Sequence, residues 1–178
     1  MKNQNGLSEK QRIEKATAEL FLKIYNAKFG TGYQIQELSD TPDVICIDKN
    51  SDEVLKLEIS LLEDLPGDVP YQLGRNRKPI SPTTRTTAVS FWDDTVKQLQ
   101  KSLENKLLAR YDSNTALVLR QVSILWEPED WEVVAHRFRN GVLVGKENNY
   151  GKGVWIICTD NSTWPVSDTI FCLSKPEN

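Results

Sequence analysis

A predicted hairpin constrains this chain more than any other feature of its sequence. Residues 43–48 and 54–62 are short runs rich in residues that favour strands, and the polar residues 49–52 between them suit a tight turn. If the turn is centred between Asn50 and Ser51, Asp43 lies directly opposite Glu58. Directly opposed residues have Cβ atoms about 5 Å apart, so the two carboxylates could share one divalent cation.

Alternation along the hairpin separates an apolar face from a more polar one. The apolar face, which we expect in the core, consists of Val44, Cys46, Leu55, Leu57, Ile59 and Leu61. The other face gathers its polar residues at one end, where it carries Asp43, Lys56, Glu58 and Ser60. A half-buried surface with clustered carboxylates fits a metal site at that end of the hairpin.

Apolar periodicity elsewhere places the hairpin inside a mixed α/β domain. We expect a helix capped by Ser8 that runs to about Phe29 and stops at Gly30, with one stripe made of Ile13, Ala16, Leu20, Ile24 and Ala27. Two further helices are expected at about 91–111 and from Pro128 to before Gly141. Further strands are expected at residues 33–38, 116–125, 154–159 and 169–173. The fold class is therefore α/β (α+β mixed), with a central mixed sheet flanked by helices, and residues 1–178 are expected to form a single domain.

An irregular basic insertion is expected at about residues 63–90, where four prolines disfavour helix and central strand. The whole chain has a formal net charge of -3, which does not predict a general nucleic-acid binder. Residues 71–90, however, contain no acidic residue and carry Arg75, Arg77, Lys78 and Arg85. These side chains suit phosphate oxygens of DNA, although a solvated loop would have the same composition.

The chain lacks the patterns of a membrane or secreted protein. No apolar stretch is long enough to cross a bilayer, and residues 1–8 are polar, so we expect no membrane contact and a cytoplasmic location. Cys46, Cys158 and Cys172 lie inside apolar runs at spacings that match neither a zinc site nor a disulfide framework. We expect buried, reduced thiols.

The segment Pro42-Asp43, followed after fourteen residues by Glu58-Ile59-Ser60, resembles the motif of the PD-(D/E)XK nuclease superfamily. The restriction-endonuclease-like αβββαβ core of that family has the order of elements expected here from residue 8 to about residue 125. The resemblance implies a DNA endonuclease that hydrolyses phosphodiester bonds with Mg²⁺ or Mn²⁺. It also implies that Asp43, Glu58 and the backbone carbonyl of Ile59 hold the metal, with Glu14 of the first helix as a supporting carboxylate.

The sequence departs from the family's motif at its third position, where Ser60 replaces the usual lysine. A serine hydroxyl can bind a water but supplies no positive charge. Lys56, on the same strand face, and Lys97, on the second helix, could supply that charge, and parity favours Lys56. The alternative is a catalytically inactive nuclease-fold protein that acts as a nucleic-acid-binding or assembly subunit. By analogy with palindrome-cutting relatives, a homodimer is also possible.

Overall fold

The structure, a computed structural model, describes residues 6–62, 97, 101, 103, 106, 108, 109, 111–121, 128–137, 140, 150–160 and 167–174. The described helices and strands, in chain order, are α1 (Glu9–Phe29), β1 (Tyr33–Leu38), β2 (Val44–Asp48), β3 (Val54–Leu62), β4 (Thr115–Gln121), α4 (Pro128–Arg137), β5 (Val154–Asp160) and β6 (Ser167–Cys172). The expected insertion at 63–90 lies outside the described residues. Of the helix expected at 91–111, the described positions 97, 101, 103, 106 and 108 have helical backbone.

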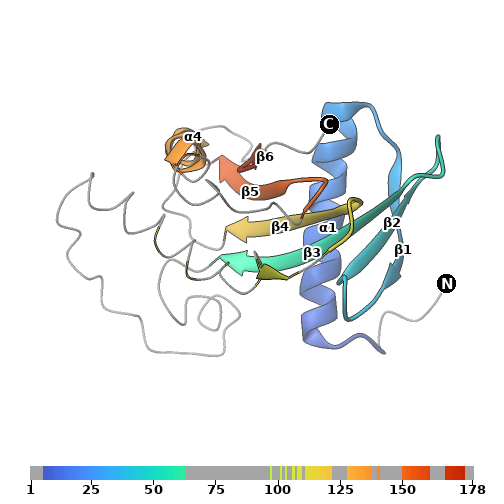
Figure 1. Cartoon of the computed structure of the whole chain (residues 1–178). Coiled ribbons are helices and arrows are strands. Elements are labelled where there is room, and N and C mark those ends of the chain that lie inside the picture. Colours follow the sequence, from blue (N-terminus) through green and yellow to red (C-terminus); the bar gives the residue numbers. More distant parts are fainter. Residues whose placement is uncertain are drawn as a thin grey trace.

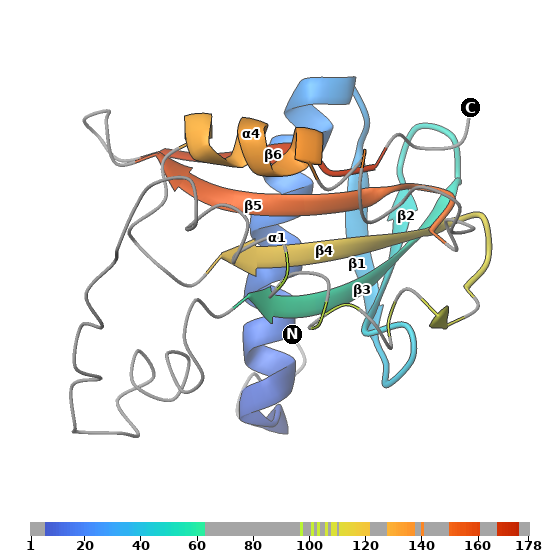
Figure 2. The same cartoon turned by 60° about the vertical axis from the view of Figure 1, so that its left-hand side comes forward.

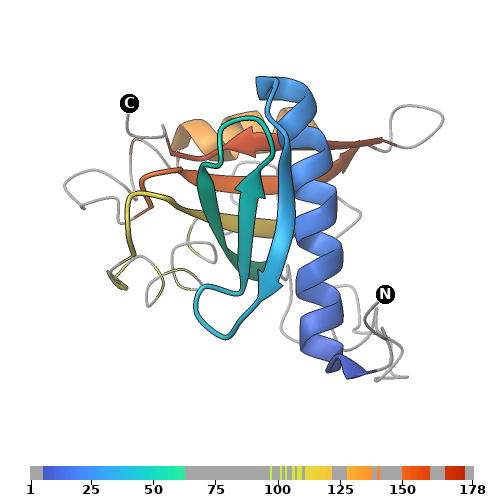
Figure 3. The same cartoon turned by 90° about the vertical axis from the view of Figure 1, so that its right-hand side faces the viewer.

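The six strands form one mixed sheet in the order β1-β2-β3-β4-β5-β6. β2 is antiparallel to both β1 and β3, whereas β3, β4 and β5 run parallel, and β6 is antiparallel to β5. Figure 1 shows β3, β4 and β5 pointing the same way. In Figure 3 the β1-β2-β3 meander faces the viewer. The predicted mixed α/β class with a central mixed sheet is confirmed.

The two described helices cover opposite faces of the sheet. Side chains of α1 pack with one set of buried residues from β2, β3, β4 and β5, and side chains of α4 pack with the alternate set from β4 and β5. In Figure 2, α4 lies along β5 while α1 passes across the other face. None of the helices among these residues is both long and apolar enough to cross a membrane.

Local sequence sets both ends of α1 as expected. The Ser8 hydroxyl accepts a hydrogen bond from the backbone N–H of Gln11, and the Gln11 side chain accepts one from the Ser8 backbone N–H, which completes a capping box. Gly30 then ends the helix in the left-handed region, with φ of 67°. The bounds of this helix were therefore predictable from its capping residues.

The buried face of α1 differs from the predicted stripe. Its buried residues are Glu14, Thr17, Ala18, Phe21 and Leu22, whereas Ala16 and Ala27 are exposed. The aromatic rings of Phe21, Tyr25 and Phe29 pack against Trp155 of β5, with ring centroids 5.6–6.1 Å apart. Large aromatic side chains bury more area than the aliphatic stripe, so they decide which face turns inward. The same rotation turns Glu14 toward the sheet.

The three cysteines, all within the described residues, form no disulfide. Cys46 in β2 and Cys158 in β5 are buried, and Cys172 at the end of β6 is half-buried. Burial raises the pKa of the Cys46 thiol to about 12, which keeps it protonated near neutral pH. The expectation of buried, reduced thiols is thus confirmed for Cys46 and Cys158.

Candidate active site

The hairpin has the predicted register. Val44 pairs with Leu57 and Ile47 pairs with Val54. Extending this register by one residue places Asp43 opposite Glu58. The strand itself begins at Val44, one residue later than predicted, so Asp43 lies just outside the ladder and its side chain can turn toward the end of the sheet.

Asp43 is buried, with 4% of its surface exposed, and its carboxylate is held at both oxygens. Oδ2 accepts a hydrogen bond of 2.8 Å from the backbone N–H of Ile59, and Oδ1 lies 3.1 Å from Nζ of Lys10. The backbone N–H of Ile59 lies beyond the ladder with β2, and the Asp43 side chain takes the place of a backbone acceptor there. Since the N–H and C=O of one strand residue point to the same side, the Ile59 carbonyl also faces the Asp43 side of β3.

The first turns of α1 bring a second carboxylate to Asp43 through a shared lysine. Nζ of Lys10 lies 2.7 Å from Oε1 of Glu14, one helical turn further along. Burial raises the pKa of the Glu14 carboxyl, the Lys10 ammonium opposes that shift, and the charge of Asp43 adds to it. The hydrogen bond to Glu14 in turn holds the pKa of Lys10 above its usual value.

Glu58 faces the opposite side of the sheet from α1, and its two carboxylate oxygens have different surroundings. Nζ of Lys106 lies 2.6 Å from Oε1. Oε2 is buried and has no hydrogen-bond partner within the part of the chain that the structure describes. Buried polar atoms nearly always have a partner, so this oxygen marks a position where a donor or a cation would be stabilising.

Two stacked tyrosines lie on the Glu58 side of the sheet. The rings of Tyr111 and Tyr150 are 4.9 Å apart, and the Tyr150 hydroxyl donates a hydrogen bond of 3.1 Å to the backbone carbonyl of Lys106. Burial raises the pKa of Tyr111, and the negative charge of Glu58 raises it further. Burial also raises the pKa of Tyr150, so both hydroxyls keep their protons near neutral pH, and Tyr150 holds the backbone that carries Lys106.

The other predicted site residues make no contact with these carboxylates among the interactions of the described residues. Lys56 is half-buried and donates to Asp112, which precedes β4, and this contact lowers the pKa of Asp112. Ser60 is half-buried opposite Leu119 of β4, and Lys97 is exposed on the second helix. The predicted DNA contacts Arg75, Arg77, Lys78 and Arg85 lie outside the described residues.

Sequence reasoning missed two lysines of the site, Lys10 and Lys106. Lys10 had a visible signal, since it stands four residues before Glu14, the spacing of a helical ion pair. Lys106 had a weaker one, because it stands three residues after the apolar Leu103 and therefore flanks the inward side of the second helix. Its partner Glu58 could not be inferred without the tertiary arrangement.

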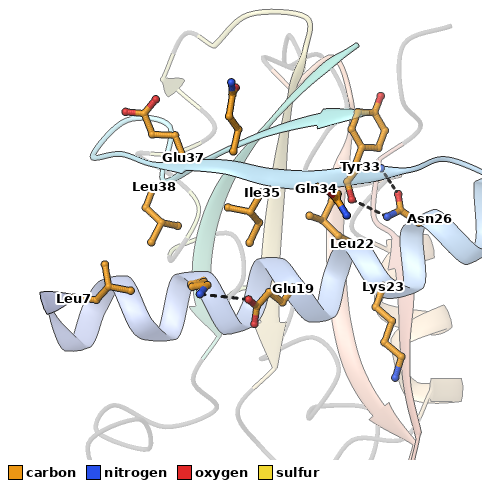
Figure 4. A pocket seen from close by; sticks show the side chains of 12 residues that line it. Leu7, Glu19, Leu22, Lys23, Asn26, Tyr33, Gln34, Ile35, Glu37 and Leu38 are labelled. Carbon is orange, nitrogen blue, oxygen red and sulfur yellow. Dashed lines mark hydrogen bonds and ion pairs between the residues drawn. The ribbon is translucent and has the colours of Figure 1, made fainter. Parts of the chain in front are cut away.

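A groove among the described residues lies away from these carboxylates. It lies between α1 and β1, has a volume of about 660 Å³, and is lined by apolar Leu22, Ile35 and Leu38 with Glu19 and Lys23 at its rim. In Figure 4, Leu22, Ile35 and Leu38 lie between the helix and the edge strand, whereas Lys23 points away from that strand. None of Glu14, Asp43 and Glu58 lines it. The groove therefore lies apart from the buried carboxylates, whose oxygens suit the binding of a cation.

The donor set suits a hard divalent cation, since it offers a backbone carbonyl and carboxylate oxygens, one of which lacks a hydrogen-bond partner among the described residues. Three or more His, Cys, Asp or Glu side chains close enough to hold a metal ion do not occur among the described residues. An ion shared by Asp43 and Glu58 would therefore need backbone or solvent oxygens as well. No family model, curated protein or solved structure matches this chain.

Proposed function

We propose that this chain is a Mg²⁺- or Mn²⁺-dependent DNA endonuclease with a restriction-endonuclease-like αβββαβ core. The observation that carries the proposal is the register of β2 and β3, which sets two buried carboxylates, Asp43 and Glu58, opposite each other. The order of a helix, three antiparallel strands and a fourth strand parallel to the third supports the same core. Neither feature alone distinguishes this core from other mixed sheets, and their combination favours it.

Asp43, Glu58 and the Ile59 carbonyl are the groups that would hold the ion. When bound, such an ion supplies Lewis acidity toward the phosphate and lowers the pKa of a coordinated water. Asp43 is already oriented by the Ile59 N–H, and Glu58 by Lys106. The side chains therefore need little rearrangement, which is the condition for electrostatic preorganisation.

Lys106 is our candidate for the positive charge that Ser60 does not supply. Its ammonium contacts Glu58 from the second helix, and an ammonium beside the metal carboxylate can stabilise negative charge that develops on a phosphate. The sequence favoured Lys56 for this role, but Lys56 is paired with Asp112. Ser60 remains a candidate to bind the attacking water, and Glu14 a candidate to hold Lys10 against Asp43.

Plasmid cleavage tests this proposal. In Mg²⁺ or Mn²⁺ we expect Asp43→Asn and Glu58→Gln to lower the rate by at least about a hundredfold, and Lys106→Met by at least about tenfold. Lys56→Met and the control Glu19→Gln, which changes an exposed carboxylate on α1, should cleave like the wild type. Undiminished cleavage by the first two variants, or none by the wild type with either ion, would refute the proposal.

DNA recognition is proposed to involve the basic segment that carries Arg75, Arg77, Lys78 and Arg85. Four cationic side chains without acidic neighbours suit the phosphate backbone of DNA. A homodimer would allow both strands of a duplex to be cut, and it stays a prediction from analogy with palindrome-cutting relatives.

One observation favours the second candidate, a nuclease-fold subunit that binds nucleic acid or assembles with a protein but does not cut. Lys10 and Lys106 already contact Asp43 and Glu58, so the carboxylates are partly neutralised without an ion. Calorimetric titration with Mn²⁺ separates the two functions. Heat of binding that disappears in Asp43→Asn supports the enzyme, whereas an identical, heat-free titration of both proteins supports the subunit.

A further inference from the structure

Lys10 makes the contacts that an ion at Asp43 would need to make. Its ammonium lies 3.1 Å from Oδ1 of Asp43 and 2.7 Å from Oε1 of Glu14, and Oδ1 is the oxygen that the Ile59 N–H leaves open. We propose that Lys10 is an internal counter-ion that must leave Asp43 before a divalent cation binds, so that this lysine sets the ion affinity of the site. This inference rests on the proposed function.

Exposure singles out Lys10 as the lysine that leaves. Its side chain is 66% exposed, whereas that of Lys106 is 27% exposed. An ammonium that is already largely solvated on the first turns of a helix can turn fully into water, since its stem is flexible and its charged end already reaches the solvent. Among the described residues, the Lys106 ammonium contacts Oε1 of Glu58 and no donor contacts Oε2, so an ion bound at Oε2 would not have to displace Lys106.

Charge balance gives the exchange its direction. When Glu14, Asp43 and Glu58 are all ionised, three negative charges face the two positive charges of Lys10 and Lys106. Replacing the single charge of Lys10 by a divalent cation leaves these groups neutral. A buried group of charges is least costly when it is balanced, so the divalent ion is the better counter-ion.

Asp43 can keep its orientation when Lys10 leaves, because a second hydrogen bond holds its side chain. Its Oδ2 stays bonded to the Ile59 N–H at 2.8 Å after Lys10 has left, so Oδ1 keeps its orientation. Glu14 keeps its place on the buried face of α1, next to the position that Lys10 vacates. The site is therefore preorganised for the incoming ion, and the competition with Lys10 is the main cost of binding.

Calorimetric titration of MnCl₂ into purified full-length variants tests this inference. Lys10→Met keeps the length of the side chain and removes the charge, and we expect it to bind Mn²⁺ at least about tenfold more tightly than the wild type. Lys15→Met is the matched control, because Lys15 also lies on α1 and pairs with a glutamate one turn on, Glu19, at 3.7 Å. It removes the same charge away from the site and should bind like the wild type.

Thermal unfolding gives a second measurement that does not need catalysis. Lys10→Met should melt below the wild type without metal, because two carboxylates lose their counter-ion, and should gain more from added Mn²⁺ than the wild type does. Equal Mn²⁺ affinity of the wild type and Lys10→Met, or an equal gain in Lys15→Met, would overturn the inference while leaving the proposed function intact. Absence of Mn²⁺ binding in every variant, Lys10→Met included, would overturn both.

Discussion

Asp43 stabilises the fold through a hydrogen bond that is independent of any role in catalysis or metal binding. Its Oδ2 is the acceptor for the Ile59 N–H, a buried backbone donor beside the start of β2. We expect Asp43→Ala to destabilise the fold by about 1–3 kcal/mol, because it leaves that donor unpaired. Asp43→Asn should cost less than about 1 kcal/mol, since its amide oxygen can still accept from Ile59 and only the ion pair with the exposed Lys10 is lost. Urea unfolding of both variants measures the difference, and equal stabilities would contradict this role for the carboxylate.

Single residues of the site were partly predictable from the sequence. The length of the turn was enough to set Asp43 opposite Glu58, because a strand pair with a fixed turn has only one register. Glu14, the carboxylate expected from the first helix, is buried, whereas Glu19 of the same helix is exposed. Lys106 was missed, since its contact with Glu58 joins residues 48 positions apart and no local pattern encodes that distance.

At the scale of elements, the turn before β5 packs against the turn before β4 and is hydrogen-bonded to the start of β4. The N–H of Lys152 donates to the Thr115 carbonyl, and Gly151 packs directly on the backbone of Ser113. A methyl group on Gly151 would lie 2.7 Å from Cα of Ser113, closer than real Cβ contacts. Both turns adjoin the stacked pair Tyr111 and Tyr150, so this contact holds the tyrosine side of the candidate site.

We therefore expect Gly151→Ala to destabilise the protein by about 1–3 kcal/mol, as overpacking against backbone typically does. Gly6→Ala is the control, because nothing lies within 4 Å of the added methyl group. Equilibrium unfolding in urea gives both values. If Gly151→Ala unfolds at the same urea concentration as Gly6→Ala, the two turns are not in the close contact described.

Element boundaries followed from local signals, whereas the orientation of elements did not. Ser8 and Gly30 defined the two ends of α1 through a capping box and a left-handed residue. The inward face of the same helix was predicted about one residue off, because it depends on Trp155, which lies on β5 more than a hundred residues later in the chain. A stripe of aliphatic residues therefore predicts a helix more safely than it predicts which face is buried.

At the scale of the whole molecule, the candidate site draws on both faces of the sheet. Lys10 and Glu14 come from α1 on one face, Glu58 and Lys106 lie on the other, and Asp43 stands between them just before β2 begins. The mixed α/β class was predictable from the order of helical and strand patterns. The meeting of the two faces at Asp43 was not, since it depends on contacts between residues that are 33 and 48 positions apart in the sequence.

Diffraction from crystals soaked in MnCl₂, recorded near the manganese absorption edge, tests the central claim most directly. We predict an anomalous peak within about 2.5 Å of carboxylate oxygens from both Asp43 and Glu58, with the Lys10 ammonium turned away into solvent. Carboxylates that keep Lys10 and Lys106 as their partners, with no peak between Asp43 and Glu58, would contradict the existence of a shared metal site and with it the proposed nuclease.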